Sequence, residues 1–146
     1  MDTPDSRATG MDRKALLSTI WIFVVLNYLY CDVVSLKDAG VLKQYLGGNV
    51  DGMEMTQRFL LGGKILMEIS IVMVLLSRVL EFSANRWANI IAGTVTTLVQ
   101  LLTLFTRSSR MYYWFFSIIE IASTAAVVWL AWSWCSPADA SDAQTR

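Results

Sequence analysis

Ionisable side chains stand inside stretches of this sequence that are otherwise apolar. Lys64 and Glu68 lie in LLGGKILMEIS, and Glu120 lies in YYWFFSIIEI. With Asp32, near the end of a third apolar stretch, one lysine faces three carboxylates. In a poorly hydrated place the excess negative charge must be protonated, hydrated or matched by a cation. These residue types therefore predict a site for a small cation or for protons.

Four apolar segments carry these residues. Each is close to the ~20 residues that a helix needs to cross the hydrocarbon core of a bilayer. Hydrophobic residues make up 55% of the 146-residue chain and charged residues 16%. Parts of the segments are apolar on all sides, whereas the helices of a soluble bundle carry a broad charged face. The sequence predicts an all-α fold, a four-helix transmembrane bundle that runs up-down-up-down. The predicted helices are residues 15–36, 59–80, 87–106 and 112–135.

Polar tails flank the predicted membrane domain of residues 14–135. Residues 1–13 and 136–146 are expected to be disordered. The long connection after the first helix is expected to form a short helix on the membrane and then to turn at GGNVDG. Four spans place both termini on one side. Arg13 and Lys14 favour the cytoplasmic side, although the near-even count of basic residues on the two sides leaves dual topology open.

Each predicted helix carries its polar residues on one face. Such stripes are costly against lipid, so we expect them to face one another. The stripe of the third helix is Asn89, Gly93, Thr96, Thr97, Gln100 and Thr103, and that of the fourth is Tyr113, Ser117, Glu120 and Thr124.

Helical rise predicts two layers of polar residues in the half of the bundle under the long loop. One layer lies roughly 6–9 Å from that membrane face and the other roughly 13–14 Å. The other half is expected to be largely apolar. The candidate ligand-binding residues are Asp32, Lys64 and Gln100 in the first layer, and Asn27, Glu68 and Glu120 in the second. The alternative is that these groups only hold helices together, with Lys64 and Glu68 neutralising each other one turn apart.

Several kinds of chemistry are excluded by composition. The chain has no histidine, which argues against histidine-ligated haem or copper and against the usual zinc sites. Its two cysteines, Cys31 and Cys135, are predicted at opposite membrane faces, so a disulfide between them is not expected. Twelve basic residues balance twelve acidic ones, so nucleic-acid binding is not expected. We expect no cofactor or metal. The expected partners are the lipid bilayer and a small-molecule or cation ligand, and the oligomeric state is left open.

Four stretches together resemble an uncharacterised family of small prokaryotic four-span membrane proteins. The resemblance covers about residues 11–135 and implies a multi-pass protein of a bacterial or archaeal plasma membrane, but it brings no known chemistry. A glutamate followed by apolar residues and a closing arginine in the second span is also similar to the pattern of DoxX-like proteins. The four stretches are IWIFVVLNYLYCDV, LMEISIVMVLLSRVL, ANRWANIIAG and YYWFFSIIEI.

Three functions fit these observations. The preferred interpretation is a protein that binds or transports a small cationic solute or protons at the carboxylate-rich pocket. The second is a DoxX-like accessory or redox-linked membrane subunit. The third is a membrane-embedded acid/base enzyme that acts on a lipid, which needs two converging carboxylates and a slot that Tyr28 and Tyr30 could line.

Overall fold

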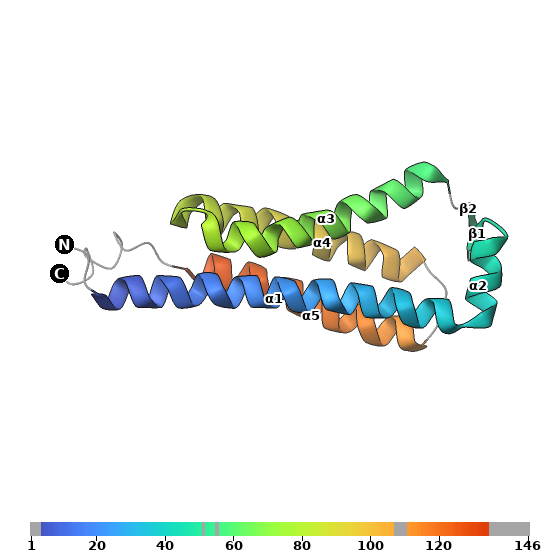
Figure 1. The fold of residues 1–146 in the computed structure, drawn as a ribbon, viewed down its shortest axis with the longest axis horizontal. Coiled ribbons are helices and arrows are strands. Elements are labelled where there is room, and N and C mark those ends of the chain that lie inside the picture. Colours follow the sequence, from blue (N-terminus) through green and yellow to red (C-terminus); the bar gives the residue numbers. More distant parts are fainter. Residues whose placement is uncertain (1–3, 51, 55, 107–110, 135–146) are drawn as a thin grey trace.

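Four long helices lie along one common axis (Figure 1). The structure is a computed structural model that describes residues 4–50, 52–54, 56–106 and 111–134, without the side chains of residues 4–11, 53, 59 and 106. Each long helix is long and apolar enough to cross a membrane, so the predicted all-α four-span bundle is confirmed and the chain is a multi-pass membrane protein. The long helices are α1 (Pro4–Lys37), α3 (Gln57–Val79), α4 (Phe82–Thr106) and α5 (Met111–Trp132).

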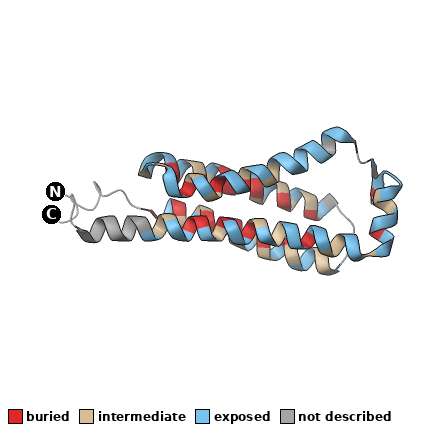
Figure 2. Ribbon diagram, viewed as in Figure 1, coloured by how far each residue is buried: buried red, intermediate tan, exposed pale blue. Residues whose placement is uncertain are grey.

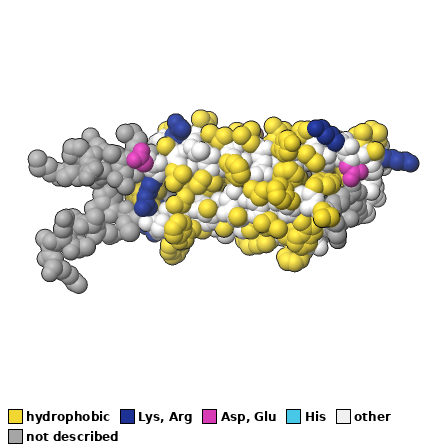
Figure 3. Space-filling view, turned by 90° about the horizontal axis from the view of Figure 1, so that it is seen from below, with side chains coloured by type: hydrophobic (Ala, Val, Ile, Leu, Met, Phe, Trp, Pro, Cys, Tyr) yellow, Lys and Arg dark blue, Asp and Glu magenta, His cyan; other side chains and the backbone are white. Residues whose placement is uncertain are grey.

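The outer surface agrees with this assignment. On the face seen in Figure 3, charged side chains gather toward the two ends of the molecule, and the band between them is apolar or uncharged. The start of α1 and the end of α5 lie at the same end of the bundle (Figure 1). We refer to this end as the terminal end and to the other as the loop end.

Two helix starts differ from the predicted ones by five residues or more. Helix α1 begins at Pro4, so residues 4–13, which were expected to be part of a disordered tail, are helical. Proline suits the first turn of a helix because its missing N–H has no partner there in any case. Helix α4 begins at Phe82 rather than at residue 87, which leaves Leu80 and Glu81 as the whole connection to α3. The predicted tail at residues 136–146 lies outside the described residues.

The long connection folds as expected into a short helix and a turn. Helix α2 (Ala39–Leu46) is capped by Asp38, whose side chain accepts hydrogen bonds from the backbone N–H groups of Gly40 and Val41. Strands β1 (Asn49–Val50) and β2 (Met53–Glu54) then pair as a minimal antiparallel hairpin. Gly48 and Gly52 have φ of 71° and 82°, a left-handed conformation that glycine adopts without strain. These elements lie across the loop end of the bundle (Figure 1).

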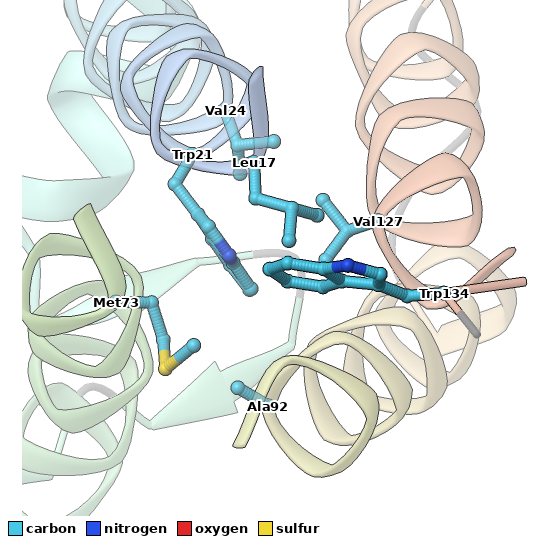
Figure 4. Packing of buried hydrophobic residues seen from close by; sticks show 7 residues of the cluster. All are labelled: Leu17, Trp21, Val24, Met73, Ala92, Val127 and Trp134. Carbon is cyan, nitrogen blue, oxygen red and sulfur yellow. The ribbon is translucent and has the colours of Figure 1, made fainter. Parts of the chain in front are cut away.

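The apolar core lies toward the terminal end. Side chains from all four long helices converge there, as Figure 4 shows, and Trp21 and Val24 of α1 are fully buried. The contributing positions lie in the middle of α1, in the first half of α4, late in α3, and late in or just after α5. The cluster is Leu17, Trp21, Val24, Met73, Ala92, Val127 and Trp134.

A buried polar network lies in the same half, which was expected to be largely apolar. Asn89 accepts hydrogen bonds at Oδ1 from Trp21 Nε1 (2.8 Å) and Ser77 Oγ (3.2 Å). Its Nδ2 donates to the backbone O (2.9 Å) and the Oδ1 (2.6 Å) of Asn85. Asn85 in turn donates to the backbone O of Ser77 at 2.6 Å. The expectation of an apolar half is therefore wrong. This network joins α1, α3 and α4, and its polar side chains satisfy one another.

Candidate functional site

Among the described residues, the loop-end half of the bundle holds one buried carboxylate, Glu120 of α5. Its side chain is 2% exposed, and that of Gln100 on α4 is 7% exposed. Gln100 Nε2 donates to Glu120 Oε2 at 2.5 Å and to Ser117 Oγ at 3.1 Å. The structure thus brings together Gln100 and Glu120, as predicted, and adds Ser117, which was placed on the polar stripe but not among the candidate ligands. Gln100 fixes one carboxylate oxygen.

Close packing of α4 against α5 positions this pair. A Cβ on Gly93 would lie 2.7 Å from Val128 Cγ2 and 3.3 Å from the backbone O of Thr124, so only glycine permits this approach of the two helices. One turn further along α4, Thr97 Oγ1 lies 2.7 Å from Thr124 Oγ1. The predicted polar stripes of these two helices therefore do face each other. Gln100 and Glu120 are the next pair along the same α4–α5 contact.

Three buried oxygen atoms in this half of the bundle have no hydrogen-bond partner among the described residues. They are Glu120 Oε1, Tyr28 Oη and Asn27 Oδ1. Tyr28 and Glu120 are close enough for the charge of one to act on the other, and Asp32 acts electrostatically on Glu120 in the same way. Buried polar atoms are normally satisfied by a partner, so unpaired oxygens from α1 and α5 are the features of this region that call for an occupant.

An apolar groove of about 460 Å³ runs along α1 beside this cluster and reaches α5 at Phe116. Asn27 is its amide-bearing residue, so the groove borders one of the unpaired oxygens. Tyr30 and Phe116 meet edge to face across it, with ring centroids 5.8 Å apart. Its lining consists of Phe23, Leu26, Asn27, Leu29, Tyr30, Val33 and Phe116.

The remaining predicted site residues lie elsewhere. Lys64 and Glu68 are exposed on α3, on the face opposite to Ser70, Met73 and Ser77, which are buried against the bundle. The prediction that Lys64 and Glu68 face the interior is therefore wrong. The alternative, in which they neutralise each other one turn apart, is not seen either, because neither side chain makes a hydrogen bond or ion pair with another described residue.

The path of α3 explains why Lys64 and Glu68 are exposed. No described side chain from residue 57 to residue 69 is buried, and Figure 2 shows this half of the helix as almost wholly exposed. The first half leans away from α1, and only the second half packs in the core (Figure 1). Asp32 is also exposed, although its charge acts on Glu120. The carboxylate-rich pocket predicted from six residues is thus reduced to a cluster around a single buried carboxylate.

This cluster has a limited chemical repertoire. The unpaired atoms of Asn27 and of an ionised Glu120 are acceptors, while the Tyr28 hydroxyl can both donate and accept. Among the described residues, no group of three or more histidine, cysteine or acidic side chains is arranged to hold a metal ion. The arrangement favours a ligand that donates hydrogen bonds and carries positive charge.

Comparison with known proteins places the chain in a family. The sequence matches the family of unknown function DUF6326 over residues 8–141, nearly its whole length. The chain belongs to this family. No curated protein and no solved structure gives a match. The weaker resemblance of this DUF6326 protein to DoxX-like proteins is not among these findings and stays a prediction.

Proposed function

We propose that this DUF6326 protein binds a small cationic solute, or a proton, within the membrane at Glu120, either to carry it or to respond to it. The observation that supports the proposal best is the buried Oε1 of Glu120, which has no partner although Gln100 holds the other carboxylate oxygen. A carboxylate at membrane depth is costly unless something matches its charge.

The neighbouring groups fit a protonated amine. An ammonium group has three donors, and Glu120 and Tyr28, which act on each other electrostatically, offer unpaired oxygens to accept from it. Asn27 offers a further unpaired oxygen at the border of the groove. The groove beside Asn27 offers an apolar surface for a short hydrocarbon chain attached to such a group. In this arrangement Gln100 and Ser117 would orient Glu120 without contacting the solute.

The lipid-modifying enzyme has less support. Acid/base catalysis by two carboxylates requires both to converge on one substrate. Glu120 is buried, whereas Asp32 and Glu68 are exposed on different helices. The redox interpretation has no specific observation in its favour. We therefore retain the cation-binding function.

We also propose that the terminal end of the bundle, with the start of α1 and the end of α5, faces the cytoplasm. Arg13, Lys14 and Arg86 all donate hydrogen bonds to backbone carbonyl groups at the terminal end. Arg78 lies in the last turn of α3 at the same end. Basic residues close to the ends of spans favour the cytoplasmic side.

Binding of hexylammonium to the purified protein in mild detergent tests the cation site. We expect increasing hexylammonium to raise the melting temperature of the wild type, because a ligand that binds only the folded state stabilises it. Hexanoate, of similar length but opposite charge, should not. Glu120→Gln should abolish the shift, whereas Glu68→Gln, which changes an exposed carboxylate, should retain it. Equal shifts in the two variants would contradict a cation site at Glu120. No shift in the wild type would exclude an alkylammonium ligand and leave only the proton.

A further inference from the structure

The outward face of α3 carries two charges inside a membrane span. The span covers Leu60–Val79, and helical rise places Lys64 about 6 Å and Glu68 about 12 Å from its start. Both side chains are exposed and lie on the opposite side of the helix from its buried residues. A lysine can extend its stem toward the membrane surface, but a glutamate is too short to do so from this depth. Glu68 therefore needs a partner that this chain does not supply among its described residues.

The residues around these charges have the spacing of a helix-pairing seam. Leu61, Lys64, Glu68, Ile71 and Leu75 follow one another at intervals of three, four, three and four residues, which is the a/d pattern of helices that pack side by side. All five are exposed, and Leu61 and Leu75 are 57% and 66% exposed.

We propose that a second copy of this chain packs against the outward face of α3, so that Lys64 of each copy pairs with Glu68 of the other. The seam is defined as Leu61, Lys64, Glu68, Ile71 and Leu75. Its single positive and single negative charge lie one helical turn apart, so the seam is complementary to itself under a two-fold axis. The rise from one position to the other, about 6 Å, is within the reach of a lysine side chain.

Charge argues for a second copy rather than an unrelated helix. The two copies together contribute two lysines and two glutamates, so the interface is neutral and each charge has a partner of opposite sign. All five seam residues are exposed, so the seam is accessible along its length. This inference does not depend on the cation site at Glu120, which lies inside the bundle on α5.

Charge exchange tests the interface. The full-length protein in mild detergent is studied by analytical ultracentrifugation over a hundredfold range of concentration, and in liposomes by energy transfer between labelled copies. We expect the wild type to dimerise. Lys64→Glu and Glu68→Lys should each raise the dissociation constant at least tenfold, because four like charges then meet. The double variant Lys64→Glu/Glu68→Lys should return it to within threefold of the wild type, because the pairs form again with reversed sign.

Two further comparisons separate pairing from misfolding. Lys64→Met and Glu68→Gln remove a charge without creating repulsion, and each should weaken the dimer while the helical content measured by circular dichroism stays unchanged. Lys43→Glu, an exposed change on α2 outside the spans, should leave the dissociation constant unaltered. A monomeric wild type, or a double exchange that fails to restore association, overturns the proposal. So does a dissociation constant that neither neutral variant changes.

Discussion

Replacement of Asn89 by leucine tests the polar network that joins α1, α3 and α4. Leucine keeps the size and branching of asparagine but lacks the amide, so packing changes little while four hydrogen bonds are lost. Two of them arrive at Oδ1 from Trp21 and Ser77, and two run from Nδ2 to Asn85. Asn89 is fully buried, so water does not replace the missing partners.

The expected cost follows from these four bonds. Hydrogen bonds between membrane helices contribute about 0.6 kcal/mol on average and up to about 1.7 kcal/mol. The Ser77 hydroxyl can turn to a carbonyl of its own helix, as serine in helices often does. The indole N–H of Trp21 has no such substitute. We therefore expect Asn89→Leu to lower the free energy of unfolding by about 2 kcal/mol. Trp21→Phe should destabilise the wild type, but it should have much less effect on the stability of a protein that already carries Asn89→Leu.

Unfolding by sodium dodecyl sulfate in mixed micelles, followed by tryptophan fluorescence, measures this loss. The matched control is Asn27→Leu, in the other half of the same bundle. The Oδ1 of Asn27 has no partner, so its replacement removes no bond at that atom and should change stability by less than about 0.5 kcal/mol or increase it. If Asn27→Leu proves as damaging as Asn89→Leu, the hydrogen-bond account of this network is refuted.

Two other expectations concern packing and orientation. Gly93→Leu should destabilise the protein by about 1–3 kcal/mol or more in the same unfolding assay, because the new side chain would collide with Val128 and the backbone of Thr124. Thr94→Leu, at an exposed position, should be tolerated. Similar losses of stability in the two variants would show that α4 and α5 do not approach each other closely at Gly93. Reporter fusions at residue 5 and residue 140 should both report the cytoplasm; signals from opposite sides would contradict four spans, and mixed signals at both ends would indicate dual topology.

The sequence predicted the facing stripes of α4 and α5 because both helices carry their small and polar residues at a single periodicity. Asn89, Gly93 and Gln100 can lie on only one side of a helix, and that side is buried. Gln100 and Glu120 were predicted in adjacent layers of the same pocket, and the length of the glutamine side chain spans the step between the layers.

Helix α3 could not be oriented by the same argument, because it has polar residues on two opposite faces. Lys64 and Glu68 lie on one face, and Ser70 and Ser77 on the other. Greater weight on small side chains would have identified the inner face, because serine at a helix contact allows close packing and can bond to a neighbouring backbone. Ser18 does so, donating to the backbone O of Val74 at 2.9 Å. The departure of the first half of α3 from the bundle was not predicted, because that half also carries apolar residues suited to a core.

The cations at the terminal end connect two properties that are usually treated separately. Lys14 of α1 donates to the carbonyl of Leu80 just after α3, at 2.7 Å, while Arg13 and Arg86 donate to the carbonyls of Ser133 and Trp132 at the end of α5. The last carbonyls of a helix have no partner within it, so these side chains close helix ends that belong to other segments. Basic residues at this position also orient a chain during insertion. Substitutions that remove these basic residues in order to reverse the membrane orientation would therefore also remove the hydrogen bonds to the carbonyls at the ends of α3 and α5. A protein that evolved the reversed orientation would need other side chains to bond these carbonyls before it could match the stability of the original.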